Sequence, residues 1–179
     1  MIWQKIKLGD ICDIFNGGTP NSKEKSYWGE GLQWITPKDM GKMKTRSISL
    51  TDRQITKLGL ANSSAKLIPE NSVILSCRAP IGHVAINKVP MSFNQGCKGL
   101  VPKDELLTEF LYYFLIASKR LLNKLGSGTT FKEISGGTLS NVEIPLPSLS
   151  EQQKIVANLD YCFTEIDKNI STTKKWMVL

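Results

Sequence analysis

The sequence predicts an α+β fold, in which a mixed α/β globular domain is followed by a long C-terminal α-helix of the coiled-coil type. Three features predict it: an apolar, β-branched run at 72–76 that resumes at 83–86, an amphipathic segment at 109–125, and a stretch from 150 to 179 without glycine or proline. With 179 residues, 41% hydrophobic and 22% charged, the chain has the composition of one ordinary domain plus one extra element. We therefore divide it into a domain over 1–149 and a helix over 150–179.

The first half of the chain predicts short strands joined by turns. An apolar segment at 8–15 leads into the turn sequence Asn-Gly-Gly-Thr-Pro at 16–20, where the two glycines permit positive φ and the proline favours an extended exit. Residues 33–36 predict a strand that ends at Pro37, and 52–60 predict a short helix. The runs at 72–76 and 83–86 flank a turn with proline and glycine, which indicates a hairpin.

The second half predicts two helices. Residues 91–101 indicate another strand pair or a bulged strand, and 109–125 a helix that Gly126 ends. Residues 142–147 should be extended, because the residue before each proline avoids helical angles. Ser150 is a suitable N-cap for the last helix, with Glu151 in its first turn.

This last helix carries an apolar stripe at three- and four-residue spacing. The helix-pairing residues that we predict are Val156, Leu159, Phe163, Ile166, Ile170, Thr173 and Met177. The stripe could pack back on its own domain. However, a helix of this length reaches about 42 Å, which is longer than such a domain can cover. We therefore expect part of the stripe to pair with another helix.

The charge distribution indicates a polyanionic partner. The net charge is +7, and the window 23–66 has nine basic and four acidic residues, which leaves +5 of that total. Solvated lysine-rich loops are the alternative explanation. No apolar run is long enough for a membrane span and no signal-peptide core is present, so we expect a cytoplasmic protein with no membrane association.

Motifs for catalysis are missing from the sequence. It contains no Pro-Pro pair of the kind that amino-methyltransferases use, none of its sixteen acidic residues has lysine two positions later, and it has neither a P-loop nor Gly-x-Ser-x-Gly. Its four cysteines and single histidine, His83, lack zinc-site spacing. We expect His83 to be a sheet residue and the chain to be a binding protein with no catalytic residues, no metal and no cofactor of its own.

Double-stranded DNA is the polyanion that the polar loops fit best. Lysine and arginine contact phosphates, whereas arginine, glutamine and threonine also reach base edges. The DNA-binding residues that we predict by type and loop position are Lys23, Lys25, Lys38, Lys42, Lys44, Arg46, Arg78, Gln95, Thr129 and Thr130. Neutralising the basic residues at 42, 44 and 46 together should weaken DNA binding across sequences.

An ordered set of short motifs resembles a known family. The motifs are Leu8-Gly9-Asp10-Ile11 after Trp3, Gly17-Gly18-Thr19-Pro20, Tyr27-Trp28-Gly29, Trp34-Ile35, Ser76-Cys77-Arg78-Ala79-Pro80-Ile81-Gly82, Asn94-Gln95-Gly96, Gly128-Thr129-Thr130-Phe131 and Ile144-Pro145-Leu146-Pro147 before Glu151-Gln152. Together they resemble the specificity subunit (S, or HsdS) of type I restriction-modification systems over nearly the whole chain. The sequence departs from the family at Ser148-Leu149, where Pro-Leu is usual, and at Ala79, where glycine is common.

The resemblance implies a target-recognition domain that directs a larger complex to half of a bipartite DNA site. Its partners would be methyltransferase (M) subunits, which bind S-adenosylmethionine and methylate adenine N6, and restriction (R) subunits, which use ATP and Mg²⁺. Such subunits usually carry two recognition domains whose long helices pair. Only one of each is present here, so we expect a half-subunit that forms a homodimer through its C-terminal helix.

Three alternatives stay open at this point. The chain could be a truncated or phase-variable fragment of a two-domain subunit. It could be a protein-only adaptor or inhibitor of such a complex, which would lack salt-dependent DNA affinity. It could also be an enzyme, such as a nuclease or a self-contained methyltransferase, although the motif search argues against this.

Overall fold

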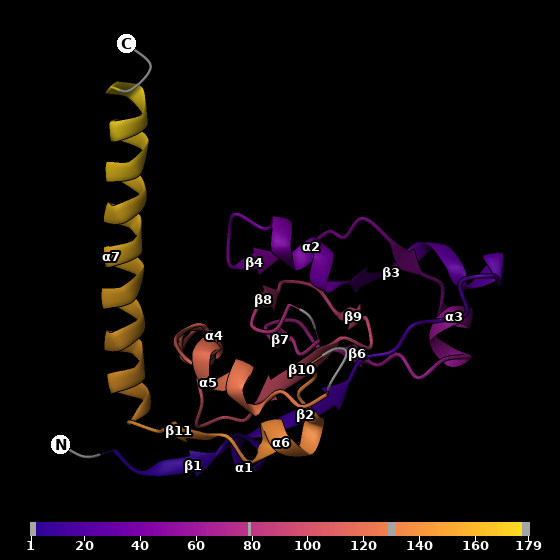
Figure 1. Ribbon diagram of the computed structural model, residues 1–179, viewed down its shortest axis with the longest axis horizontal. Helices are drawn as coiled ribbons and strands as arrows, with labels where there is room; N and C mark the ends of the chain where they lie inside the picture. The colour runs from indigo at the N-terminus through magenta and orange to yellow at the C-terminus, as the bar shows by residue number, and fades with distance from the viewer. Residues whose placement is uncertain (1–2, 79, 129–131, 177–179) are drawn as a thin grey trace.

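The computed structural model describes residues 3–78, 80–128 and 132–176, with the backbone alone for 171–176. Two main β-sheets and several short helices form the globular part, and one long helix, α7 (Leu149–Trp176), rises beside it (Figure 1). This arrangement confirms the predicted α+β class and the long C-terminal helix. Within the described residues, no helix combines the length and the apolar character that a membrane crossing requires.

The larger sheet contains the predicted hairpin. Its five strands, in spatial order, are β2 (Cys12–Asn16), β10 (Cys97–Pro102), β7 (Val73–Ser76), β8 (Val84–Asn87) and β4 (Ser47–Ile48). Strands β7 and β8 are antiparallel, with Val73 opposite Ile86 and Leu75 opposite Val84. All residues of these two strands are buried, which explains why the segment has a continuous apolar character instead of an alternating one.

The second sheet corrects two predictions. Its four strands, in spatial order, are β5 (Gln54–Ile55), β3 (Trp28–Ile35), β9 (Met91–Phe93) and β6 (Leu67–Ile68). Strands β9 and β10 therefore lie in different sheets and do not pair with each other, although both fall within the segment 91–101. Only the end of the predicted helix at 52–60 is helical, as α3 (Lys57–Ala61), because Gln54 and Ile55 pair with β3 and Thr56 caps the helix.

The main core lies against the helices that follow the sheets. The segment predicted as one helix at 109–125 is two, α4 (Thr108–Ala117) and α5 (Lys119–Leu125), because Ser118 between them has ψ near 2°. Leu111, Leu115 and Leu122 are fully buried in this core. Four short helices were not predicted: α1 (Leu8–Ile11), η1 (Lys25–Tyr27), α2 (Pro37–Lys42) and α6 (Gly136–Ser140).

A small two-stranded sheet leads into α7. Strand β1 (Lys5–Lys7) pairs antiparallel with β11 (Glu143–Pro145), and the chain then enters the long helix. The predicted cap is displaced by two residues: Ser148 Oγ accepts from Glu151 N at 3.3 Å, and Glu151 Oε2 accepts from Ser148 N at 3.2 Å. This is a capping box. Ser148, which departs from the family pattern, thus accepts a hydrogen bond from a backbone N–H group in the first turn of α7.

Candidate nucleic-acid interface

Two loops that are far apart in the sequence meet at one end of the sheets. Gly17 N donates to the Cys97 carbonyl at 3.2 Å, and Gly18 N donates to the Phe93 carbonyl at 3.0 Å. A Cβ atom on Gly17 would lie 2.0 Å from the carbonyl oxygen of Asn94, so no larger residue fits without a shift of the backbone. The glycines at 17 and 18 are therefore required for close approach.

This finding corrects the reason that the sequence suggested for these glycines. Positive φ was expected at 17 and 18, but among the described residues the glycines with positive φ are Gly29, Gly82 and Gly128. The turn at 16–20 is thus formed by close backbone packing, without left-handed backbone angles.

The meeting of the loops places three polar side chains in a chain of hydrogen bonds. Asn94 Nδ2 donates to Thr19 Oγ1 at 2.9 Å, and Thr19 Oγ1 donates to Gln95 Oε1. Asn94 Oδ1 in turn accepts from Gly96 N at 2.8 Å. Gln95, one of the predicted base-contacting residues, is exposed and has its amide oriented by these neighbours.

A second polar group lies beside this chain of hydrogen bonds. Arg78 N donates to the Gly96 carbonyl at 3.1 Å, and its guanidinium Nε lies 3.3 Å from Glu133 Oε2. The ammonium of Lys98 lies 3.8 Å from the other oxygen of Glu133, although the Lys98 side chain is only 6% exposed. We call Thr19, Arg78, Asn94, Gln95, Lys98 and Glu133 the polar edge.

Sequence reasoning found only part of the polar edge. Arg78 and Gln95 were predicted as DNA contacts, and the structure places their loops next to each other; contact with DNA stays a prediction. Thr19, Asn94, Lys98 and Glu133 were not among the predicted contacts. The signal for Lys98 was a single basic residue inside an otherwise apolar strand, which is rare unless an acid lies nearby. The predicted contacts Thr129 and Thr130 lie outside the described residues.

The five lysines that were predicted as phosphate contacts are all exposed. Lys23 and Lys25 lie in or next to η1, Lys38 and Lys42 lie on α2, and Lys44 follows that helix. Lys42 forms an ion pair with Asp52 at 2.8 Å. The hydrogen bond raises the pKa of Lys42 and lowers the pKa of Asp52.

Arg46 occupies a different environment from these lysines. Its guanidinium forms hydrogen bonds with Asp160 on α7 and with the hydroxyl of Tyr113 on α4. The Arg46 side chain is 32% exposed and already has a carboxylate partner within the chain. Its role in DNA binding stays a prediction.

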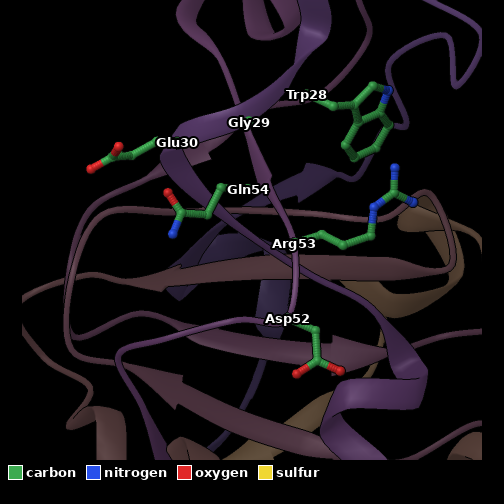
Figure 2. A pocket seen from close by; sticks show the side chains of 6 residues that line it. All are labelled: Trp28, Gly29, Glu30, Asp52, Arg53 and Gln54. Carbon is green, nitrogen blue, oxygen red and sulfur yellow. The ribbon is translucent and has the colours of Figure 1, made fainter. Parts of the chain in front are cut away.

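An open hollow of about 380 Å³ lies where β3 meets β5, lined by 28–30 and 52–54. Figure 2 shows the Arg53 side chain reaching toward the Trp28 ring, whereas Glu30 and Asp52 point away from it. The Arg53 guanidinium lies 3.6 Å from the Trp28 ring centroid. Trp28 also packs edge-on against buried Trp34, with centroids 5.0 Å apart, so it serves the core as well as the surface.

The predicted helix-pairing residues divide between two environments. Val156 packs against the main core and Leu159 is partly buried. Phe163 stacks on Tyr113 with ring centroids 5.7 Å apart but is still 47% exposed. Ile166 and Ile170 are 50% and 49% exposed. The side chain of Thr173 is not described, and Met177 lies outside the described residues. Pairing of this stripe with another helix stays a prediction.

Burial dominates the pKa shifts of the buried thiols and of the histidine. Burial raises the pKa of the Cys12 and Cys77 thiols to about 12, so neither forms a thiolate near neutral pH. Burial, and then the charge of Lys119, lower the pKa of His83, which lies just before β8 and not within it. Among the described residues, no group of three or more histidine, cysteine or acidic side chains could hold a metal ion.

The chain combines a mixed α/β domain, polar loops that meet at one end of its sheets, and a long terminal helix. Residues 2–173 match the family described as the type I restriction modification DNA specificity domain. The chain therefore belongs to this family, as the sequence motifs indicated.

Known relatives agree with this assignment. The chain is 42% identical over 170 residues to the MjaIX specificity subunit of Methanocaldococcus jannaschii, covering 93% of this chain and 39% of that protein. It is 34% identical to the EcoR124I/EcoR124II specificity subunit of Escherichia coli, covering 86% of this chain and 39% of that protein. The crystal structure of the HsdS subunit from Thermoanaerobacter tengcongensis matches with a TM-score of 0.69 and 29% identity, over 93% of this chain and 38% of that chain. The chain thus spans about two fifths of the length of these relatives.

Proposed function

We propose that this chain is a non-catalytic DNA-recognition module that directs a type I restriction-modification complex to one half of a bipartite DNA site. The observation that carries the proposal is the polar edge, where four parts of the chain bring the exposed side chains of Gln95 and Arg78 together. Lysines would contact phosphates and set the affinity, while the amide and guanidinium groups would contact base edges.

The oriented amide of Gln95 supports a role in base recognition. Its oxygen already accepts a hydrogen bond from Thr19, which Asn94 holds in place. A glutamine with a fixed amide can offer its oxygen and nitrogen together to N6 and N7 of adenine in the major groove. Fixing the side chain before binding reduces the rotamer entropy lost on contact.

The exposed apolar residues of α7 support pairing with a second helix. Ile166 and Ile170 repeat at four-residue spacing along the same face as Phe163, and each is about half exposed. We propose that this face pairs with the α7 of a second copy, so that two recognition domains lie at a fixed separation. In the competing arrangement, this chain is a fragment of a two-domain subunit, and its helix pairs with the helix of the second domain of the same subunit. That arrangement predicts that this chain alone stays monomeric.

The remaining partners follow from the family. The complex would contain M subunits with S-adenosylmethionine and R subunits with ATP and Mg²⁺, and those partners would carry the methylation and cleavage chemistry. A chain that serves such a complex would act in the cytoplasm.

The direct test is the salt dependence of binding to duplex DNA, measured by fluorescence anisotropy. A module with about three phosphate contacts should give a slope near −3 when log K is plotted against log salt concentration. Replacing Lys38 and Lys44 with glutamine should make that slope shallower by about 2 if both lysines contact phosphate. The triple substitution that includes Arg46 is less specific, because it also removes the contact with Asp160.

A matched control removes the same charge elsewhere. Lys5 and Lys7 are exposed on β1, at the opposite end of the domain from α2 (Figure 1). Their double replacement with glutamine should leave the slope nearly unchanged. Affinity that does not respond to salt, or an equal loss in both double variants, would contradict DNA binding at the proposed surface and would favour an adaptor that binds protein only.

A further inference from the structure

A compact side-chain cluster connects the globular domain to the long helix. Arg46, which lies between α2 and β4, donates from Nη1 and Nη2 to the two carboxylate oxygens of Asp160 on α7, the second at 3.1 Å. Arg46 Nη1 also donates to the Tyr113 hydroxyl on α4 at 3.2 Å, and that hydroxyl donates to Asp160. We call these three residues the helix lock.

The helix lock has apolar support from the same elements. The ring of Phe163 stacks on Tyr113 with an interplanar angle of 5°, and the Arg46 guanidinium lies 5.8 Å from the centroid of the Tyr113 ring. A two-pronged guanidinium–carboxylate contact fixes orientation as well as distance. Two segments distant in sequence, the loop that carries Arg46 and helix α4, thus converge on one carboxylate of α7.

The helix lock attaches α7 to the domain at a second point, some distance beyond the start of the helix. Near the start of the helix, buried Gln152 accepts from Leu107 N at 2.9 Å and donates to the carbonyls of Glu105 and Pro147. Asp160 lies eight residues further on, about 12 Å along the axis. One attachment point lets a helix pivot, whereas two separated points fix its direction.

We propose that Arg46, Tyr113 and Asp160 are positioning residues that set the direction in which α7 leaves the recognition domain. Beyond them, the helix continues to Trp176, about 24 Å further. Given the proposed function, this direction determines where a second recognition domain lies relative to the polar edge, and hence which half-site separation fits. The helix direction itself is a property of the chain without DNA.

The protonation states of Asp160 and Tyr113 keep the hydrogen bonds of the helix lock formed over a wide pH range. Although burial raises the pKa of Asp160, hydrogen bonds from Arg46 and Tyr113 outweigh it and lower that pKa. Burial and the hydrogen bond to Asp160 raise the pKa of Tyr113 to about 12, so its hydroxyl remains a donor at alkaline pH. A carboxylate with a lowered pKa loses its contribution only when the pH falls through that value. The cluster therefore stays intact from mildly acidic to alkaline conditions.

The test is a distance between two spin labels measured by pulsed electron paramagnetic resonance on the full chain without DNA. One label attaches to Cys162, which is exposed on α7, whereas Cys12, Cys77 and Cys97 are buried. The other attaches to a K57C substitution at the exposed start of α3. Cys162 lies about 15 Å beyond Gln152, so a pivot of about 20° would move it by about 5 Å.

The labelled chain should give one narrow distance distribution, and D160A should broaden it or shift it by several ångström. D167A is the matched control, because it removes an exposed carboxylate one heptad further along the same helix and should change nothing. R46D should resemble D160A, and R46D combined with D160R should restore the narrow distribution. If D160A unfolds the domain, R46K takes its place, since it keeps the charge but loses the second hydrogen bond.

An unchanged distribution in a folded D160A variant would overturn the proposal, as would an equal change in D167A. Because no DNA is present, this result is independent of whether the polar edge binds DNA. If the chain fails to bind DNA but D160A broadens the distribution, the positioning role stands and the proposed function does not.

Discussion

The polar edge and the outer part of α7, residues 161–170, differ in how completely their side chains are satisfied within the chain. At the polar edge, Gln95 and Arg78 already have hydrogen-bonding or ionic partners from neighbouring loops. On outer α7, Ile166 and Ile170 leave half of their surface exposed. The proposed function accounts for this difference, because it assigns a polar partner to the first region and an apolar partner helix to the second. Four predictions test this distinction.

The largest effect is expected on outer α7. Replacing Ile166 and Ile170 together with aspartate should abolish pairing, because each side chain contributes about 1.5–3 kcal/mol when buried in an interface. The dissociation constant should rise at least about 100-fold. Sedimentation velocity over a range of protein concentrations measures the change, and DNA affinity per domain should stay the same. A variant that associates as strongly as the unaltered chain would show that these residues are not in the interface.

A substitution in the inner part of α7, residues 149–160, should lower the stability of the folded chain, whereas the substitutions on outer α7 act on pairing. Q152A leaves the Leu107 amide and the carbonyls of Glu105 and Pro147 without their partner, which should cost about 3 kcal/mol of unfolding free energy. Urea denaturation measures this loss. Q153A, at the exposed neighbouring position, should change stability by less than about 0.5 kcal/mol. Similar midpoints for both variants would mean that Gln152 does not anchor the helix.

The packing behind the polar edge should be sensitive to a single methyl group. G17A places a Cβ against the Asn94 carbonyl, which should lower the unfolding free energy by about 1–3 kcal/mol and weaken DNA binding. G137A is the control, because the nearest atom to its Cβ is 4.0 Å away and the residue lies in α6. That control should be neutral or slightly stabilising. Thermal melting measures the stability of both variants, and fluorescence anisotropy on the same samples measures their DNA affinity. A G17A variant with unchanged stability would contradict the close approach of the two loops.

The smallest effect should come from the acid within the polar edge. Glu133 holds both Arg78 and Lys98, so E133Q should release positive charge and raise DNA affinity a few-fold, with a salt slope steeper by about 1. E143Q removes the same charge from β11, away from this edge (Figure 1), and should have little effect. Weaker binding by E133Q would show that Glu133 organises the site more than it competes with phosphate.

Local sequence patterns predicted the elements whose burial is regular. The hairpin at 72–86 was predictable because two apolar, β-branched runs flank a turn that contains proline and glycine. The start of the last helix was predicted at Ser150, but the Ser-x-x-Glu pattern at 148–151 was available and places the cap correctly. The break at Ser118 was not predictable, because the apolar spacing continues across it into α5.

The candidate site was less predictable, because it depends on contacts between distant segments. Residue type and loop position suggested Arg78 and Gln95, but nothing local indicates that Glu133 lies beside Arg78 and Lys98. Arg46 illustrates the same limit: it belongs to a basic segment that suggests phosphate contacts, yet its carboxylate partner is 114 residues away on α7. Composition therefore indicated a basic and polar surface, whereas the ionic partners of Arg46 and Arg78 depend on the fold.

The central claim is that the polar edge binds DNA while outer α7 does not. Amide chemical-shift perturbation on titration with duplex DNA at low salt tests it residue by residue. We expect the largest changes at Gly18, Gln95 and Gly96, with negligible changes at Ile166 and Ile170. Perturbations that concentrate along outer α7, or an edge that does not respond to DNA, would contradict the account.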